Sequence, residues 1–279
     1  MDNPSQISPE KLTFFKNKAK EIRRQTFEMV IKAGKGHLGG SFSIVELLVV
    51  LYHGGILRFN PKNPKWDKRD IFILSKGHSS NSLYVILSDL GFFPKSELDI
   101  FSKNGSILGQ HCDVNVPGIE NISGSLGHGL GFGSGVAFGY KIDRKDNLVF
   151  VILGDGECQE GSTWEAAMFA GHRELNNLTA IIDRNRLGSE EFTEKTCRLE
   201  PLAEKWKDFG WDVKEITGHD FSEIITTLES CRDKSRVRPL AIISNTVKGK
   251  GLSCLENTPR AHHTLPKGEE IELSRKELT

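Results

Sequence analysis

Short apolar runs alternate along this chain with longer segments of helical periodicity, and few folds accommodate that order. The apolar runs lie at 70–74, 148–153, 178–182 and 240–244, with a weaker one near 211–216. Helical patterns lie around them, at 10–33, at 43–51, directly after 75–79, at 162–174, near 199–209 and near 221–232. Strands that alternate with helices are typical of an α/β fold with a parallel sheet flanked by helices. Since no linker or long-period repeat interrupts the pattern, we expect 1–279 to form a single domain with irregular N- and C-terminal extensions, the second from Lys248 onward.

Local signals predict where several of these helices begin and end. Gly34 follows the last periodic residue of the first helix, as is typical of a helix C-terminus. A serine followed three positions later by glutamate is typical of a capping box at a helix start. The pairs Ser43 with Glu46 and Ser162 with Glu165 therefore predict two helix starts.

The segment 124–139 is rich in glycine. Four of its glycines are spaced by four positions, with further glycines between them: Gly127, Gly131, Gly135 and Gly139, then Gly124, Gly129 and Gly133. On a helix the four-spaced set forms one face without side chains, at a cost of about 1 kcal/mol for each glycine relative to alanine. Close approach by a backbone or a ligand would offset that cost, so we expect a tightly packed helix near a site or a subunit contact. A flexible glycine loop is the alternative, although 136–138 are not linker residues.

The charge balance excludes several classes of function. Lysine and arginine together number 37, as do aspartate and glutamate, so the formal net charge is zero. Binding to nucleic acid or to a membrane surface needs a basic excess, and no apolar run reaches the roughly 18 residues of a membrane span. The polar N-terminus lacks a signal-peptide core. The five cysteines are scattered and form no CxxC pair, so we expect neither a zinc nor a disulfide framework, and a cytoplasmic location.

Polar residues follow two of the predicted strands at the point where each strand ends. Gly154-Asp155-Gly156 comes directly after the run 148–153, and Asn185 follows the next run along the chain. The carboxyl ends of parallel strands share one edge of a sheet, where open α/β proteins bind ligands. A carboxylate and an amide oxygen suit Mg²⁺, and the flanking glycines let a diphosphate approach the backbone. A plain strand-end turn with an exposed aspartate is the alternative. No GxGxxG or P-loop motif is present.

Several histidines occur in polar, glycine-containing segments. His37, His78 and His111 lie beside glycine or in the sequence Gly-Gln-His, and His262 and His263 are adjacent in the tail. An imidazole gives or takes a proton near neutral pH, so these side chains are candidates for proton transfer. The alternative is that each is a solvated surface side chain. The other histidines considered, at 53, 172 and 219, are expected to be structural or exposed.

Beyond these local patterns, the chain resembles the N-terminal, diphosphate-binding half of transketolase, of the split type made as two separate subunits. The resemblance rests on KGHLGGSFS (35–43), RDIFILSKGHSSNSLY (69–84), GQHCDVNVPGIENISGSLGHGLG (109–131), GDGECQEGSTWEAAMFAGH (154–172), IIDRNRLG (181–188) and KGKG (248–251). These segments stand in family order and cover nearly the whole chain. The resemblance implies a thiamine-diphosphate-binding fold of the diphosphate-binding type.

The resemblance also implies a cofactor, thiamine diphosphate, held through Mg²⁺, with Ca²⁺ or Mn²⁺ as possible substitutes. It assigns the metal to Asp155, Asn185 and the backbone carbonyl of Leu187. It assigns the cofactor to a wider set: His78, Gly124, Ser125, Leu126, Gly154, Asp155, Gly156, Glu157, Glu160 and Asn185. Within that set the Gly156 N–H would contact a phosphate, and Glu160 corresponds to a buried acidic position at the family's subunit interface. His37, His111 and either His262 or His263 would line the substrate channel as catalytic residues.

The activity implied is transfer of a two-carbon ketol unit from a ketose, such as a sugar phosphate, to an aldose. The family glutamate that contacts the pyrimidine of the cofactor lies in the second half of transketolase, which this chain lacks. The resemblance therefore implies a partner subunit with the pyrimidine-binding and C-terminal domains, an α2β2 heterotetramer, and inactivity of this chain alone. Two alternatives are a related thiamine-diphosphate ketol or acyl transferase or synthase of specialised or sugar-catabolic metabolism, and a non-catalytic scaffold subunit. After Leu187 the segment 188–192 departs from the family pattern, so the resemblance leaves substrate preference open.

Overall fold

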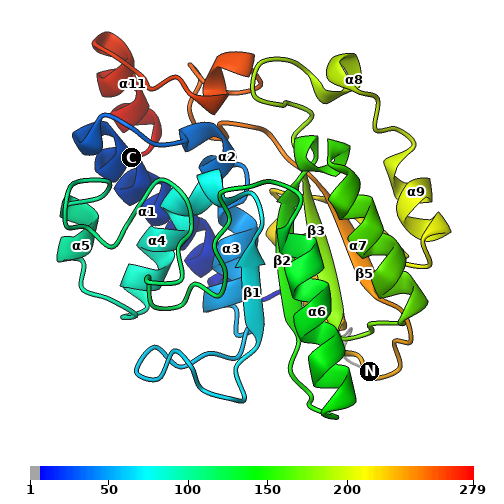
Figure 1. Ribbon diagram of the computed structural model, residues 1–279. Coiled ribbons are helices and arrows are strands. Elements are labelled where there is room, and N and C mark those ends of the chain that lie inside the picture. The colour runs from blue at the N-terminus through cyan, green and yellow to red at the C-terminus, as the bar shows by residue number, and fades with distance from the viewer. Residues whose placement is uncertain (1–6) are drawn as a thin grey trace.

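A five-stranded, fully parallel sheet forms the centre of the computed structural model, which describes residues 7–279 (Figure 1). Its strands are β1 (Ile71–Leu74), β2 (Val149–Gly154), β3 (Leu178–Arg184), β4 (Asp212–Thr217) and β5 (Leu240–Asn245), in the spatial order β1-β2-β3-β5-β4. The register places Gly154 beside Asp183 and Arg184 beside Asn245. The predicted α/β fold with a parallel sheet flanked by helices is confirmed, and all five predicted strands are present.

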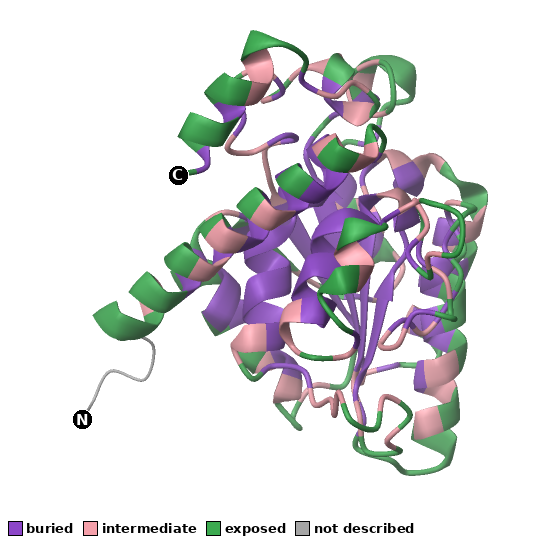
Figure 2. Ribbon diagram, turned by 90° about the vertical axis from the view of Figure 1, so that its left-hand side faces the viewer, coloured by how far each residue is buried: buried purple, intermediate pink, exposed green. Residues whose placement is uncertain are grey.

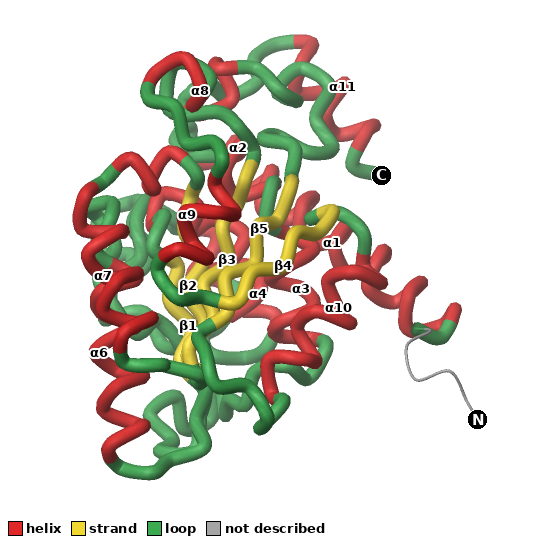
Figure 3. The backbone as a smooth tube through the Cα atoms, turned by 90° about the vertical axis from the view of Figure 1, so that its right-hand side faces the viewer, coloured by secondary structure: helices red, strands yellow, loops and turns green. Residues whose placement is uncertain are grey.

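Helices cover both faces of the sheet, as Figure 3 shows on either side of the strands. One face carries α1 (Pro9–Ala33), α3 (Val45–His53), α4 (Ser80–Asp89) and α10 (Phe221–Glu229), and the other carries α6 (Gly129–Ile142), α7 (Gly161–His172) and α9 (Leu202–Asp208). Alternate strand residues point to opposite faces, so Phe72 and Phe150 pack with the first set while Ile73 and Val151 pack with the second. Both faces are therefore buried, which explains why the strands are apolar runs without alternation (Figure 2).

The segments beyond the carboxyl ends of the strands gather at one end of the molecule, at the top of Figure 1. They include α2 (Leu38–Phe42), α8 (Thr193–Thr196) and α11 (Glu269–Glu277), together with 3₁₀ turns at Gly77–Ser79, Gly156–Gln159 and Pro259–His262. The remaining short elements are α5 (Ser96–Asp99) and a 3₁₀ turn at Ser230–Arg232. The tail after Lys248 was expected to be irregular, and that expectation is wrong in part, since it holds one of the 3₁₀ turns and α11. Ala261 and Leu278 bury apolar side chains in the core and so fix this tail.

Both predicted capping boxes are wrong, although helices do begin near them. The helix α3 begins at Val45 and α7 at Gly161, each without a side-chain cap. The Ser43 hydroxyl instead donates to the Asp183 carboxylate at 2.7 Å, and the Ser162 hydroxyl donates to the Gly127 carbonyl at 2.9 Å. Long-range partners thus took the hydroxyls that a local pattern assigned to helix ends. The predicted stop at Gly34 is confirmed, with a left-handed φ of 68°.

The glycine-rich segment forms the helix α6 from Gly129 onward, and residues 124–128 form the loop before it. The expected helix is confirmed, but its four-spaced glycine row does not pack within this chain, so only the expected subunit contact is left for that row. The four-spaced glycines of the helix, Gly131, Gly135 and Gly139, are all exposed. The buried pair is Gly129, against Ser75, and Gly133, against Val151. The sheet therefore selects the second glycine row, and the bare row faces outward.

This asymmetry predicts opposite effects for two matched glycine substitutions. Gly129→Ala places a methyl group into Ser75, including its backbone, and should destabilise the fold by about 1–3 kcal/mol through overpacking. Gly135→Ala meets no atom within 4 Å and should stabilise the isolated chain by about 0.5–1 kcal/mol through helix propensity. Chemical denaturation of both variants measures the difference. Equal midpoints would contradict the packing described here.

All five cysteines are free in the part of the chain that the structure describes. No helix of the described residues combines the length and the apolar character that a membrane crossing requires.

Candidate active site at the carboxyl edge of the sheet

A cavity of about 370 Å³ opens where the carboxyl ends of β1, β2 and β3 meet the loops above them. Its walls include many of the residues singled out in the sequence: His78, Leu126, Gly154, Asp155, Gly156, Glu157, Asn185, Leu187 and His262. Gly124, Ser125 and Glu160 are exposed and are not part of the lining. The first two lie in the loop before α6, and Glu160 occupies the position before the first residue of α7.

Two residues that follow neighbouring strands, Asp155 and Asn185, both line this cavity. Asp155 follows β2 and Asn185 follows β3, and the pairing of Gly154 with Asp183 brings the two positions together. The Asp155 carboxylate accepts hydrogen bonds from the backbone N–H of Gly156 at 2.8 Å and of Arg186 at 2.5 Å. The side chain is buried, which excludes the alternative of a plain turn with an exposed aspartate. Burial and the nearby Asp183 carboxylate raise the pKa of Asp155 to about 6.

The donor chemistry of this group fits a hard divalent cation. Asp155 offers a carboxylate, Asn185 an amide oxygen and Leu187 a backbone carbonyl, and all three residues border the same cavity. Oxygen-only ligands of this kind are the ones that Mg²⁺ and Ca²⁺ prefer. The Leu187 carbonyl accepts a hydrogen bond from the Lys248 ammonium at 3.1 Å, so a cation bound at that oxygen would have to displace or share this contact.

Lys76 is a buried cation that the sequence motifs did not single out. Its ammonium lies 2.5 Å from the Asp183 carboxylate and donates to the Gly40 carbonyl at 2.9 Å. Asp183 is fully buried and also accepts from the Asn185 amide at 2.8 Å. Burial raises the pKa of Asp183, but the Lys76 charge and the surrounding hydrogen bonds outweigh it and leave the pKa below its ordinary value. This network therefore fixes the orientation of Asn185.

Lys248 is the second buried cation, and sequence reasoning recognised it only as the start of KGKG. Besides the Leu187 carbonyl, its ammonium donates to the Gly188 carbonyl at 2.6 Å and lies 3.0 Å from Nδ1 of His262. Burial, with a contribution from the Lys76 charge, lowers the pKa of Lys248 to about 8. Lys76 and Lys248 therefore place two positive charges in a cavity that the loops after β2 and β3 border. Such a cavity suits a ligand with several negative charges.

Arg184 connects the cavity with the residues that follow the divergent segment 188–192. Its guanidinium donates to Asp155 at 3.1 Å, to the Thr193 hydroxyl at 2.8 Å, and to Glu194 and Glu200 at 2.9 and 2.7 Å. The side chain is buried. The loop that follows Leu187 is therefore tied to the aspartate at the end of β2.

Glu157 connects the 124–128 loop with the end of β2. Its buried carboxylate accepts from the backbone N–H groups of Gly127 at 2.9 Å and Gly154 at 3.1 Å, and from the Ser75 hydroxyl. Burial raises its pKa above the ordinary value. The side chain thus holds the 124–128 loop against the end of β2.

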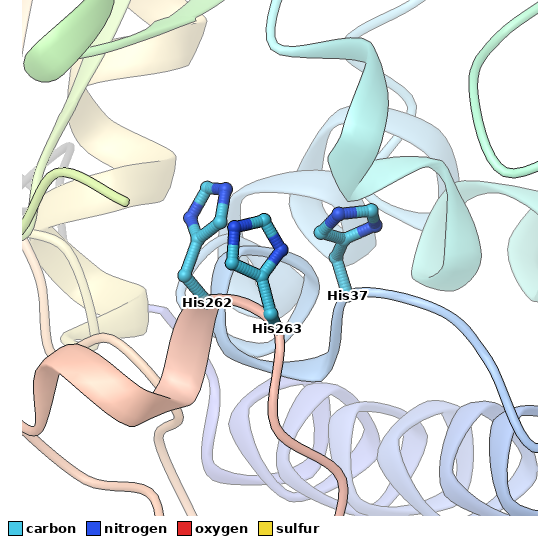
Figure 4. Close-up of side chains that lie close together, drawn as sticks. All are labelled: His37, His262 and His263. Carbon is cyan, nitrogen blue, oxygen red and sulfur yellow. The ribbon is translucent and has the colours of Figure 1, made fainter. Parts of the chain in front are cut away.

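The five histidines from the sequence analysis come together beside the cavity, with His37 at the centre. The His37 ring centroid lies 5.4 Å from that of His78, 6.0 Å from His111, 5.5 Å from His262 and 5.6 Å from His263. Figure 4 shows that His262 and His263 both stand beside His37, so the tail places two imidazoles here where one was expected.

The electrostatics of this cluster keep its inner imidazoles neutral. Burial, followed by repulsion from His111, lowers the pKa of His37 to about 4. Burial and the Lys248 charge lower the pKa of His262 to about 3, and burial with the Lys76 charge places that of His78 well below its ordinary value. His37, His78 and His262 are half-buried, which excludes the solvated-surface alternative for them, whereas His111 and His263 are exposed.

His219 was expected to be structural or exposed. It has a structural role, because it links Glu46 to the backbone beside Lys248, which lines the cavity. Its Nδ1 lies 3.1 Å from the Glu46 carboxylate, which also accepts from Arg23 at 2.7 Å. Its Nε2 accepts from the backbone N–H of Val247 at 2.9 Å. His219 therefore holds the backbone directly before Lys248.

Comparison with known proteins agrees with this arrangement. The family model described as the thiamine diphosphate binding domain of transketolase matches residues 15–279. A protein from Phocaeicola vulgatus, named as one subunit of an apulose-4-phosphate transketolase, is 43% identical over 257 residues, which cover 92% of this chain and 91% of the relative. A 6-deoxy-6-sulfo-D-fructose transketolase subunit from a Clostridium species is 41% identical over 248 residues, covering 88% and 90%.

Solved structures extend the likeness to the fold. Transketolase from Campylobacter jejuni superimposes with a TM-score of 0.89 at 31% identity, over 95% of this chain and 42% of that chain. This chain thus spans less than half the length of that whole transketolase. Because the family model covers nearly all described residues and the subunit-sized relatives match over most of their own length, this chain belongs to the transketolase family and corresponds to its thiamine-diphosphate-binding domain.

Proposed function

We propose that this chain is the cofactor-binding subunit of a two-subunit transketolase that transfers a two-carbon ketol unit from a ketose, or its phosphate, to an aldose. The observation that carries the proposal is the juxtaposition of Asp155 and Asn185 with two buried lysines and a cluster of neutral imidazoles. A cation site, a polyanion site and a set of proton-transfer groups thus border one cavity. A scaffold subunit would have no need of these buried, charged side chains.

Mg²⁺ would be held by Asp155, Asn185 and the Leu187 carbonyl, and Ca²⁺ or Mn²⁺ can replace it in such an oxygen site. The diphosphate of thiamine diphosphate would lie against Lys76 and Lys248, with the Gly156 N–H and His78 beside it. The fit is supported by the buried charge of the two lysines and by the glycines at 154 and 156, which leave the strand end without side-chain bulk.

Thiamine diphosphate, when bound, supplies the electron sink that carbon–carbon cleavage next to a carbonyl needs. The chain's own contribution is to orient the sugar and to move protons. His37 is neutral at pH 7, so it offers one N–H donor and one lone pair to sugar hydroxyls. His262 is also neutral, but its Nδ1 accepts from the Lys248 ammonium, so it offers its Nε2–H as a donor. His111 and His263 are exposed at the outer side of the cluster and would meet the substrate as it enters.

A partner subunit is supported by an outward-facing apolar surface on α6 and α7. Exposed large side chains gather there: Phe132, Ile142, Met168 and Phe169. The bare row of Gly131, Gly135 and Gly139 is also exposed on α6, and it lets another backbone come close. Exposed apolar patches of this kind mark interaction sites. The relatives that are named as transketolase subunits are of similar length, so we propose an α2β2 assembly with a subunit carrying the pyrimidine-binding and C-terminal domains, acting in the cytoplasm.

The experiment that tests the activity is a donor screen with the reconstituted pair. The two subunits are mixed with thiamine diphosphate, Mg²⁺ and an aldose acceptor, and ketoses are compared with their phosphates and sulfonates. A second candidate function, ketol transfer in the breakdown of an uncommon sugar, is favoured by the names of the two subunit-sized relatives. The preferred donor separates the two functions. Absence of turnover with every donor, despite cofactor binding, would overturn both.

Loss of one channel imidazole should affect turnover and leave the cofactor in place. His111→Ala removes an exposed ring whose centroid lies 6.0 Å from that of His37. We expect kcat/KM to fall about tenfold, the value of one lost hydrogen bond to substrate, with unchanged cofactor affinity. The control is His172→Ala, an exposed histidine at the end of α7. Equal effects of the two variants would remove His111 from the channel.

The link from Glu46 through His219 to Val247 predicts a positioning role for His219. His219→Ala should weaken thiamine diphosphate binding about tenfold, because the backbone before Lys248 loses a hydrogen bond. His219→Gln keeps an acceptor for Val247 and a donor for Glu46, so it should restore most of the affinity. Calorimetric titration of the cofactor measures both. Failure of the glutamine variant to differ from the alanine variant would contradict this role.

A further inference from the structure

We propose that His37, His262 and His263 form a second metal site, which takes a divalent d-block ion such as Zn²⁺ and is distinct from the oxygen ligands of Asp155 and Asn185. One ring nitrogen from each histidine lies within 4.8 Å of the other two. In Figure 4 the three rings stand side by side, two from the end of a 3₁₀ turn and one from the residue before α2. His263 is exposed, so the site is open to solvent on one side.

The two segments that carry these histidines are held against each other by the fold. Gly39 in α2 packs on the backbone of Ala261 so closely that a side chain at position 39 would overlap the Ala261 carbonyl. The Gly249 N–H also donates to the Gly39 carbonyl at 3.0 Å. Ala261 is buried in the core. The three imidazoles therefore start close together before any ion arrives.

The ligand chemistry separates this site from the one at the strand ends. Imidazole nitrogens suit zinc, nickel and copper, whereas carboxylate and carbonyl oxygens suit magnesium. The His37 and His262 rings are unprotonated at neutral pH, so solvent protons do not compete with an ion for them; at Nδ1 of His262 the competitor is the Lys248 ammonium. Nδ1 of His37 is buried and has no hydrogen-bond partner among residues 7–279. Zinc–nitrogen bonds of about 2.0–2.1 Å require the rings to draw together by small side-chain rotations.

Lys248 is the group that opposes the ion. Its ammonium lies 3.0 Å from Nδ1 of His262, so a divalent ion must bind against a neighbouring positive charge. Removing that charge as Lys248→Met should tighten binding of the d-block ion. The same change removes a cation from the proposed diphosphate site and should weaken thiamine diphosphate binding. Opposite signs for the two ligands are a signature that general damage to the fold would not produce.

The consequence for activity rests on the proposed function. His37 lies at the centre of the imidazole cluster through which the sugar would reach the cofactor. An ion held by three of these imidazoles blocks that path. Zn²⁺ should therefore inhibit the reconstituted enzyme in competition with the ketose donor, and a chelator should restore activity.

The test uses the isolated full chain without cofactor, with Co²⁺ as a spectroscopic substitute and Zn²⁺ in calorimetry. We expect one Co²⁺ per chain, visible absorption bands of a four- or five-coordinate ion, and displacement by Zn²⁺. His37→Ala and His263→Ala should each weaken binding at least tenfold, whereas His172→Ala should not. Binding that survives both site variants, or that His172→Ala weakens equally, would overturn the proposal.

Two further measurements separate a loss of Co²⁺ binding at the imidazoles from unfolding of the variant and from binding at the strand ends. Thermal melts show whether His37→Ala remains folded, and His263→Ala alters an exposed ring, so its effect on binding stands without that concern. Asp155→Asn should leave Co²⁺ binding unchanged, because its carboxylate is not among the three ligands. A Co²⁺ affinity lost with Asp155→Asn would place the ion at the strand ends and reject the imidazole site, whatever the donor screen shows.

Discussion

Replacing Asp155 with asparagine should weaken Mg²⁺-dependent binding of thiamine diphosphate by at least about 100-fold, since even the outer partners of metal ligands contribute 10–100-fold. The substitution keeps the shape of the side chain and removes its charge, so the metal loses its anionic ligand. Calorimetric titration of the cofactor with Mg²⁺, in the presence of the partner subunit, measures the loss. The matched control is Asp208→Asn, an exposed aspartate on α9.

The fold should tolerate this change, which makes the binding result interpretable. Burial and the Asp183 carboxylate disfavour the charged form of Asp155, as its raised pKa shows, so a neutral side chain relieves an electrostatic cost of folding near pH 7. Arg184 loses one partner but keeps Glu194 and Glu200. The amide NH2 of the variant would face one of the N–H donors that Asp155 now accepts from, which offsets part of this relief. The melting temperature of Asp155→Asn should therefore change by only a few degrees. Cofactor binding of native strength in this variant would place the metal elsewhere.

The isolated chain should show no measurable ketol transfer. Adding the partner subunit should raise turnover at least about 1,000-fold, which is within the range of rate enhancements that catalytic groups supply. The buried carboxylates that line the cavity, Asp155 and Glu157, are both engaged by backbone N–H groups of their own chain. Neither is free to act on the far end of the cofactor. Glu190 and Glu191 also border the cavity, in the loop after Leu187. As the resemblance to transketolase implies, we expect the acid for that task to come from the other subunit.

Turnover of a ketose by each chain alone and by the mixture, with native mass spectrometry of the mixture, measures this prediction. Met168→Glu places a charge in the exposed apolar surface of α6 and α7 and should reduce both assembly and turnover. Val237→Glu is the control, because Val237 is equally apolar and exposed before β5, on a different part of the surface. Full turnover by this chain alone would reject the two-subunit proposal.

Sequence reasoning worked best where the evidence was local and periodic. The runs that became β2 and β3 were recognisable because strands buried on both faces are continuously apolar. Once two such strands are parallel neighbours, the residues that follow them must meet at one edge. The proximity of Asp155 and Asn185 follows from that rule alone.

It failed where a side chain's partner lies far along the chain. Ser43 and Ser162 carry a helix-start pattern, yet both hydroxyls bond to partners 140 and 35 positions away. The two glycine rows of α6 look alike in the sequence, and only contact with β1 and β2 decides which row is buried. Lys76 and Lys248 read as ordinary solvent-exposed lysines until the fold surrounds them with carbonyls and carboxylates.

The sequence by itself determined the parallel sheet, the polar residues at its carboxyl edge and the set of histidines that gather there, because strand periodicity and strand-end position are properties of short segments. Only the tertiary structure decided the charges of the site. The charge state of each lysine, histidine and aspartate in the site depends on solvent exclusion and on charged groups that distant segments bring close. These two effects leave the lysines as buried cations, keep the inner imidazoles neutral and raise the pKa of the aspartate. The desolvation and charge–charge energies that shift these pKa values arise only when the chain has folded.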